Sequence, residues 1–202
     1  MRGQAVKDAP AGKTIKITGT IQAASASGNN GELEITKDLT IKPNGSSATL
    51  DANNLNRIFN VKSGTLTLNN MTLKKGNAGT TGNGGGIYAQ GDTEITLTNT
   101  EINSCVAEEN GGGQLYSDTQ AGKTKGNKAK NGGGIYLTGN GTAGSTMTGG
   151  KVSYNLATDT SAAKGGGIYI EESASFTMQS GNINSNEVDT GATEDGNKRR
   201  RH

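Results

Sequence analysis

The sequence predicts an all-β fold, a single-stranded parallel β-helix whose coils of about 20–33 residues stack as a solenoid along one axis. Three observations predict it: a repeated glycine cluster, apolar residues at fixed offsets from each cluster, and short runs that alternate apolar and polar residues. Because crossovers between parallel strands are nearly always right-handed, we expect a right-handed helix.

A glycine cluster followed by an apolar residue and a tyrosine recurs along the 202-residue chain. The three full copies are Gly84, Gly85, Gly86, Ile87, Tyr88; Gly132, Gly133, Gly134, Ile135, Tyr136; and Gly165, Gly166, Gly167, Ile168, Tyr169. An imperfect copy ends in Leu115 and Tyr116. Such spacing indicates one structural unit stacked on copies of itself.

Apolar residues follow each cluster at matching offsets. Ile87 is followed by Ile95, Leu97 and Ile102, and the same offsets from Ile168 lead to Phe176, Met178 and Ile183. The earlier set Ile58, Leu66, Leu68 and Leu73 has this spacing too, with residues 55–57 in place of the glycines. From Ile135 the pattern reaches Met147 and Val152 if two residues are inserted near residues 140–144.

Alternation within each unit predicts short strands. Residues 93–98 and 173–178 alternate apolar and polar side chains, which places one set on one face of a strand. About three such strands per coil, joined by Gly, Asn and Asp turns, would stack equivalent residues about 4.8 Å apart. Each inward position then becomes a column of like side chains, in which a buried methylene contributes about 0.8 kcal/mol.

The composition excludes several classes of protein. Hydrophobic residues make up 30%, aromatic residues 3%, and there are 33 glycines, so a thick globular core could not be filled. Disorder would give the same composition, but not fixed apolar offsets. The net charge of +2 does not indicate a nucleic-acid partner, and one cysteine excludes an intrachain disulfide framework.

Three regions are expected along the chain. Residues 1–12 are expected to cap the solenoid, residues 13–187 to form it, and residues 188–202 to be a polar, basic tail without fixed structure. Residues 5–9 would form a turn or short helix over a first strand pair at residues 13–17 and 31–35, because an open edge invites another chain to pair with it. No segment has the apolar length of a membrane span or signal peptide, so targeting and anchoring segments are expected outside this chain.

A second column is predicted from asparagines that follow the third apolar position by three residues. These are Asn127, Asn155 and Asn186, and Cys105 holds the same place in the Ile102 coil. Stacked amides can bond along the column and satisfy the backbone of the turns. The cysteine is therefore interpreted as a small buried side chain that interrupts the ladder. The segment around residues 114–131 lacks about six residues of a full coil, so residues 117–130 are expected to be loosened or looped out.

With these motifs in place, the chain resembles the passenger domains of the chlamydial polymorphic outer-membrane proteins, a group of bacterial autotransporters. The Gly-Gly-Ile triplets at residues 85–87, 133–135 and 166–168 are similar to that family's Gly-Gly-Ala-Ile motif, and residues 152–155 and 183–186 to its Phe-x-x-Asn motif. Gly replaces Ala, and Val or Ile replaces Phe, so the likeness is to a wider class of β-helical surface proteins. It covers roughly residues 13–187. The resemblance implies an extracellular or cell-surface adhesin or stalk.

No residue set names a reaction. The only histidine, His202, is terminal, which leaves no Ser-His-Asp or Cys-His arrangement, and no cofactor or metal is expected. Since parallel β-helices also include polysaccharide lyases and hydrolases, Arg57 with Asp51 is the best candidate pair, interpreted mainly as surface charge.

One column offers a candidate binding strip. Each of its aromatic residues directly follows the apolar residue from which the offsets of a coil are counted, such as Ile87 or Ile135. These aromatic residues are Phe59, Tyr88, Tyr116, Tyr136 and Tyr169. If the isoleucines point inward, these rings form an outward strip whose faces could bind sugars or apolar partner surfaces; reversed parity would make the rings core.

These observations favour a non-catalytic module of a bacterial cell-surface or extracellular protein, with a host-surface protein or glycan as partner and self-association as a further option. One alternative is a carbohydrate-active enzyme. Another is ice binding, because Thr65 with Thr67 and Thr96 with Thr98 form outward pairs. The threonine columns are expected to break at Thr146, Thr148 and Ser175, which counts against ice binding.

Overall fold

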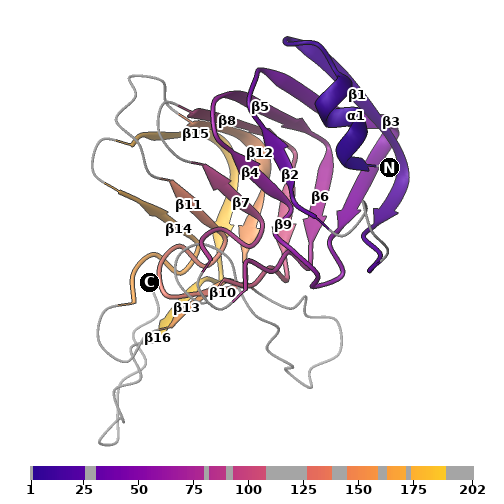
Figure 1. The fold of residues 1–202 in the computed structure, drawn as a ribbon. Coiled ribbons are helices and arrows are strands. Elements are labelled where there is room, and N and C mark those ends of the chain that lie inside the picture. The colour runs from indigo at the N-terminus through magenta and orange to yellow at the C-terminus, as the bar shows by residue number, and fades with distance from the viewer. Residues whose placement is uncertain are drawn as a thin grey trace, which may run out of the picture.

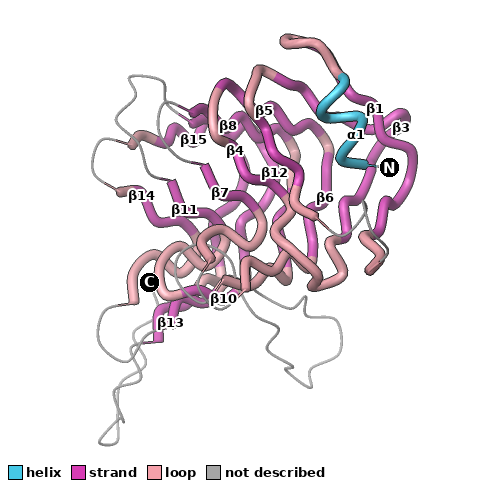
Figure 2. Tube along the Cα trace, viewed as in Figure 1, coloured by secondary structure: helices cyan, strands magenta, loops and turns pink. Residues whose placement is uncertain are grey.

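The computed structural model describes residues 2–25, 31–79, 82–89, 93–107, 127–137, 145–158, 163–171 and 174–189. The described strands form a parallel β-solenoid, as predicted, and its coils run from the N-terminal end to the yellow strands at the other end in Figure 1. Figure 2 shows the single described helix beside the first strands.

Three parallel sheets run along the solenoid. The long sheet contains β1 (Lys13–Gln22), β3 (Leu39–Asp51), β5 (Gly64–Asn69), β6 (Met71–Lys74), β8 (Thr93–Thr98), β9 (Glu101–Asn103), β12 (Ser145–Ser153) and β15 (Phe176–Asn184). The second contains β2 (Leu33–Ile35), β4 (Phe59–Val61), β7 (Ile87–Ala89), β11 (Ile135–Leu137) and β14 (Ile168–Ile170). The third contains β10 (Lys128–Ala129), β13 (Leu156–Thr158) and β16 (Glu187–Asp189).

The strand register confirms the predicted columns. Ile87 pairs with Ile135, which pairs with Ile168. Two further inward columns are also in register: Leu68, Leu97, Met147, Met178; and Leu73, Ile102, Val152, Ile183. Ile87, Leu97, Met147 and Val152 are fully buried. The thin interior is thus filled by stacked columns, each residue covered by its counterpart in the next coil.

Helix α1 (Arg2–Asp8) covers part of the N-terminal end, where Val6 is buried. The expected cap is therefore a helix, lying mainly against β2 and also against β1. The expected strand pair was wrong: Lys13 to Ile17 pair with Leu39 to Pro43, and β2 pairs with β4. Residues 33–35 belong to a different face of the coil from β1, so the two segments lie in separate sheets.

One coil is shifted by a residue from the predicted register. Phe59, and not Ile58, pairs with Ile87, while the Ile58 amide donates to the Gly85 carbonyl at 3.1 Å. The turn from β4 to β5 is one residue shorter than the turn from β7 to β8, since Leu66 still pairs with Ile95. The residues opposite the glycine cluster are therefore 56–58.

The strands that precede the imperfect repeat in the sequence pair directly with the strands that follow it. Strand β7 pairs directly with β11, and β8 and β9 pair directly with β12, so no further strand lies between them. Of the segment expected to be loosened, residues 117–126 lie outside the described residues. Residues 127–130 are described, and they include β10, which pairs with β13.

Candidate functional site

The glycine clusters are required by close backbone contacts. The first glycine of each copy has a positive φ: 64° at Gly84, 63° at Gly132 and 61° at Gly165. A Cβ on the second would collide with backbone, 2.0 Å from the Gly166 carbonyl oxygen in the case of Gly133. A Cβ on the third glycine, Gly134, would lie 2.9 Å from the Asn155 amide nitrogen. The clusters therefore serve packing at the corner of each coil.

The same conflicts recur in the other two copies. A Cβ at the second position would lie 2.3 Å from a carbonyl oxygen, that of Val106 for Gly85 and that of Glu187 for Gly166. At the third position, Gly86 would meet Ile102 at 2.8 Å, and Gly167 would meet the Asn186 amide at 2.6 Å.

The predicted asparagine ladder is formed. The Asn127 side-chain amide donates to the Asn155 side-chain oxygen, and the Asn155 amide donates to the Asn186 oxygen at 2.7 Å. Those oxygens also accept backbone N–H groups: Asn127 N at 3.2 Å and Asn155 N at 3.0 Å. Asn127 and Asn155 are fully buried, so the ladder satisfies turn amides that water does not reach.

Cys105 occupies the ladder position of the preceding coil. Its backbone N–H donates to the Asn127 side-chain oxygen, and its thiol donates to the Asn103 carbonyl at 3.3 Å. Burial raises the pKa of the Cys105 thiol to about 12. A buried thiol that stays protonated is a poor nucleophile, in agreement with a packing role.

Three of the predicted aromatic residues form an outward column. The rings of Tyr88 and Tyr136 are stacked at 6.4 Å with 24° between their planes, and those of Tyr136 and Tyr169 at 5.5 Å with 20°. The neighbouring Ile87 and Ile135 are buried inside, so alternation directs the tyrosines outward. We call Tyr88, Tyr136 and Tyr169 the tyrosine column.

The ring faces of the tyrosine column are used within the protein. Arg57 lies 5.1 Å from the centroid of Tyr88, Lys164 lies 6.0 Å from that of Tyr169, and Tyr136 is stacked on both sides and only 5% exposed. Burial, then a hydrogen bond to the Glu171 carboxylate, raises the pKa of the Tyr136 hydroxyl. A partner would thus meet ring edges and hydroxyl groups of Tyr88 and Tyr169.

Of the other two members of the predicted strip, one does not belong to this stack and the other is not described. Phe59 is fully buried because the register of its coil is shifted, and Asn60 lies in register with Tyr88 instead. Tyr116 lies outside the described residues, and Tyr88 is the direct neighbour of Tyr136 in the sheet.

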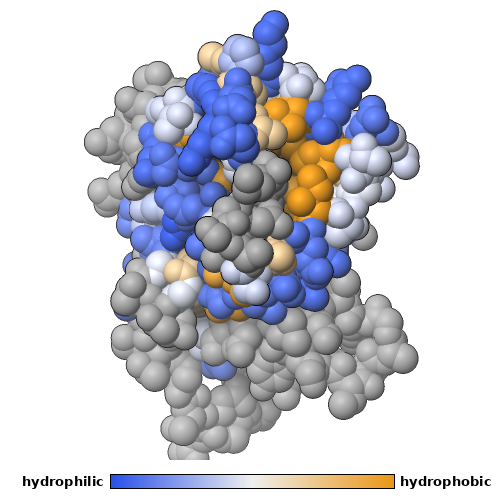
Figure 3. Space-filling model, turned by 45° about the vertical axis from the view of Figure 1, so that its right-hand side comes forward, coloured by the Kyte–Doolittle hydropathy of each residue, from blue (hydrophilic) through white to orange (hydrophobic). Residues whose placement is uncertain are grey.

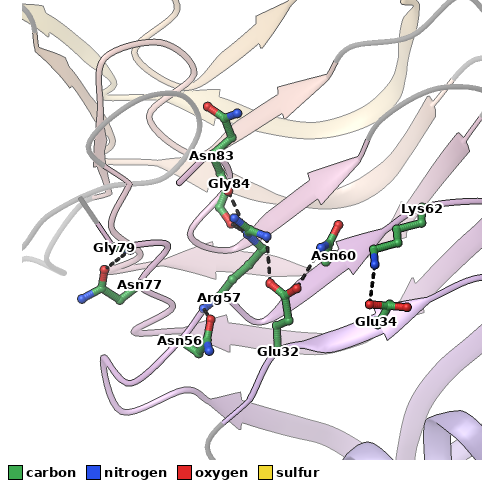
Figure 4. A network of polar contacts seen from close by, with 10 residues as sticks. All are labelled: Glu32, Glu34, Asn56, Arg57, Asn60, Lys62, Asn77, Gly79, Asn83 and Gly84. Carbon is green, nitrogen blue, oxygen red and sulfur yellow. Dashed lines mark hydrogen bonds and ion pairs between the residues drawn. The ribbon is translucent and has the colours of Figure 1, made fainter. Parts of the chain in front are cut away.

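A polar network lies around the starts of β2 and β4 (Figure 4), and its Arg57 contacts Tyr88 of the tyrosine column. Arg57 forms an ion pair of 2.7 Å with Glu32 and donates to the carbonyls of Asn83 and Gly84 at 2.8 and 3.0 Å. The Asn60 amide donates to Glu32 at 2.8 Å. Glu32 and Asn60 were not predicted, because neither lies in a repeated motif.

The candidate pair Arg57 and Asp51 is not formed. Arg57 is paired with Glu32, whereas the buried Asp51 carboxylate lies 3.4 Å from the Lys74 ammonium and 3.9 Å from that of Lys75. Asp51 also accepts the Asn53 backbone N–H at 2.8 Å. Both charged groups therefore hold adjacent coils and turns together.

Threonines form a continuous outward column on the long sheet. Each residue pairs in register with the next: Thr14, Thr40, Thr67, Thr96, Thr146 and Thr177. A second column places Thr98 beside Thr148. The expected break at Thr146 and Thr148 was wrong, because the insertion before β12 restores the register.

Comparisons with family models, curated proteins and solved structures gave no match to this chain. Among the described residues, no group of three or more His, Cys, Asp or Glu side chains could hold a metal ion. No helix in the same part of the chain is long and apolar enough to cross a membrane.

Proposed function

We propose that this chain is a non-catalytic repeat module of a bacterial surface or secreted protein, acting as a structural stalk or an adhesin-like scaffold. One observation carries the proposal: the side chains that were the best candidates for chemistry or binding are engaged between neighbouring coils. The asparagines bond one another, the tyrosines stack, and Arg57, just before β4, binds Glu32 and the glycine cluster of the next coil.

Parallel stacking suits such a role physically. Every coil adds backbone hydrogen bonds and buried columns to the one before, so the module is extended and held along its whole length. An autotransporter-like passenger, as the glycine and asparagine motifs suggest, would use this length to present a surface away from the cell. A host-surface protein or glycan is the proposed partner of the adhesin-like form.

The first experiment tests location and catalysis. Intact cells that produce the protein should be labelled by an antibody against this chain, and brief external protease treatment should remove the label. The purified chain should release neither reducing nor unsaturated ends from a panel of polysaccharides. Labelling only after lysis, or polysaccharide cleavage, would overturn the proposal.

A second experiment tests the adhesin-like form. Immobilised glycans and surface-protein extracts are probed with wild type, Tyr169→Ala and the control Tyr154→Ala, an exposed tyrosine (41%) outside the tyrosine column. Binding through the tyrosine column predicts loss with Tyr169→Ala only. Equal loss in both variants contradicts binding there, and an absence of all binding leaves the stalk as the function.

Ice binding remains a second candidate because of the threonine column. Six threonines at a spacing of about 4.8 Å present methyl and hydroxyl groups in a regular row. Thermal hysteresis that is lost in Thr96→Lys, but kept in Thr72→Lys on the neighbouring face of the long sheet, would support it. A chain without measurable hysteresis excludes it.

A further inference from the structure

The last described coil exposes apolar columns that are buried in the interior coils of the solenoid. Met178 is 42% exposed and Ile183 39%, whereas their counterparts Met147 and Val152 are fully buried. Ile170 and Val188 are exposed to 41% and 46%. An open hollow at this end is lined partly by Phe176 and Ile183. Within the part of the chain that the structure describes, strand β15 therefore pairs only with β12 and is an edge whose apolar inner side is exposed.

The first coil also ends in an edge strand with apolar residues on its inner side. Strand β1 ends the long sheet and, among the described strands, pairs only with β3, while Ile15 and Ile21 are only partly buried. Helix α1 lies mainly against β2 and leaves this end only partly covered. In Figure 3, which brings the N-terminal side forward, an apolar area remains open between hydrophilic residues.

These two edges are the opposite ends of the same columns. Following the register from coil to coil leads from Met178 to Ile15, from Ile183 to Ile21 and from Thr177 to Thr14. A second copy placed on the last coil would therefore continue each column with a residue of the same kind. Its β1 would also offer backbone groups to β15 in the parallel register found throughout the long sheet.

We propose that the partner of the exposed last coil is a second copy of this chain, joined head to tail by pairing of β15 with β1 of the next copy. The contact extends the coil-on-coil stacking already present within each molecule. Because the two surfaces differ, the association is heterologous and does not close, so it gives linear oligomers along the solenoid axis. Burial of Met178 and Ile183 against Ile15 and Ile21 provides the driving force.

Sedimentation velocity over a range of concentrations tests the association. The wild type should form oligomers that lengthen with concentration. The variants Ile183→Lys and Ile21→Lys each place a lysine on one of the two edges. Each variant should be a monomer, since an inward-pointing charge blocks edge pairing. The matched control is Leu55→Lys, because Leu55 is equally exposed (40%) but lies on neither edge strand, and it should associate as wild type does.

Mixing the two edge variants identifies the geometry. Ile183→Lys keeps an intact β1 edge and Ile21→Lys keeps an intact β15 edge, so an equal mixture should form one-to-one dimers and nothing longer. A joint between two β15 edges predicts no recovery on mixing, and that result overturns the proposal. So does a wild type that stays monomeric, or a Leu55→Lys variant that dissociates. Circular dichroism checks that each variant is folded, and Met178→Lys replaces Ile183→Lys if the latter is not.

Discussion

The asparagine ladder and the tyrosine column are both stacks of like residues, yet they stabilise the solenoid in different ways. The asparagines lie inside a turn, where each amide bonds the next amide and a backbone N–H. The tyrosines lie outside, where each ring covers its neighbour and the outer two, Tyr88 and Tyr169, stay partly exposed to solvent. The inner ladder satisfies polar groups that would otherwise be buried without partners, whereas the outer column adds contact area.

This difference predicts a ranking of substitutions, and the glycines that make room for the inner ladder come first. Gly133→Ala should lower the free energy of unfolding by more than about 3 kcal/mol, because its Cβ would meet the Gly166 carbonyl oxygen at 2.0 Å. Gly45→Ala, where the Cβ has open space, should change it by less than about 0.5 kcal/mol. Urea unfolding measures both; equal losses would contradict the packing role.

Removal of a central ladder amide comes next. Asn155→Ala leaves the Asn127 amide and backbone N–H without their acceptor, which should cost about 3 kcal/mol in thermal or urea unfolding. The exposed Asn182 on β15 serves as the control, and Asn182→Ala should stay within about 0.5 kcal/mol of wild type. A small effect at Asn155 would mean that the turns do not depend on the ladder.

The tyrosine column should tolerate change better. Tyr136→Ala is expected to cost about 2 kcal/mol, since it removes the ring between two others, and Tyr169→Ala about 1 kcal/mol, since that ring has one stacked neighbour. The exposed Tyr154 should be nearly neutral when replaced by Ala. If Tyr169→Ala proved as costly as Tyr136→Ala, mutual stacking would not be what holds the column.

The last prediction concerns an effect that appears only at high pH. The pKa of Cys105 is about 12 in the folded chain, against about 8.5 for an unfolded cysteine. The folded state therefore holds the thiol proton more tightly. This contribution to the free energy of unfolding is complete below pH 8.5 and is lost as the pH rises toward 12. Cys105→Ala should therefore show a shallower decline of unfolding free energy between about pH 9 and 11. Parallel declines in the two proteins would contradict a buried, protonated thiol.

The sequence predicted those parts of the fold that its motifs repeat. Glycine clusters and asparagines mark the same point in successive coils, so counting from Ile87, Ile135 or Ile168 gives the observed columns. For the coil that contains Phe59, the prediction aligned Ile58 with Ile87, one residue away from the observed pairing of Phe59 with Ile87. This coil lacks the glycine cluster, and the turn that follows β4 is shorter by one residue.

The candidate site was only partly predictable for a related reason. Spacing identifies which tyrosines share a column, but ring stacking depends on side-chain torsions that spacing does not determine. Likewise, Glu32 and Asn60 meet Arg57 through the shape of two coils that share no motif. Contacts between unlike residues of different coils leave no repeated signal in the sequence.

Disulfide cross-linking tests the central claim of in-register, parallel stacking most directly. The test uses two cysteine pairs in a Cys105→Ala background: Thr67→Cys with Thr96→Cys, and Thr96→Cys with Thr146→Cys. The residues of each pair lie in adjacent coils, where neighbouring strands are about 4.8 Å apart. This separation is within the Cα–Cα range of about 4.4–6.8 Å that a disulfide spans. Both pairs should oxidise readily, while Thr67→Cys with Thr146→Cys, two coils apart, should not. Failure of the Thr96 and Thr146 pair, or linkage between Thr67 and Thr146, would contradict the account.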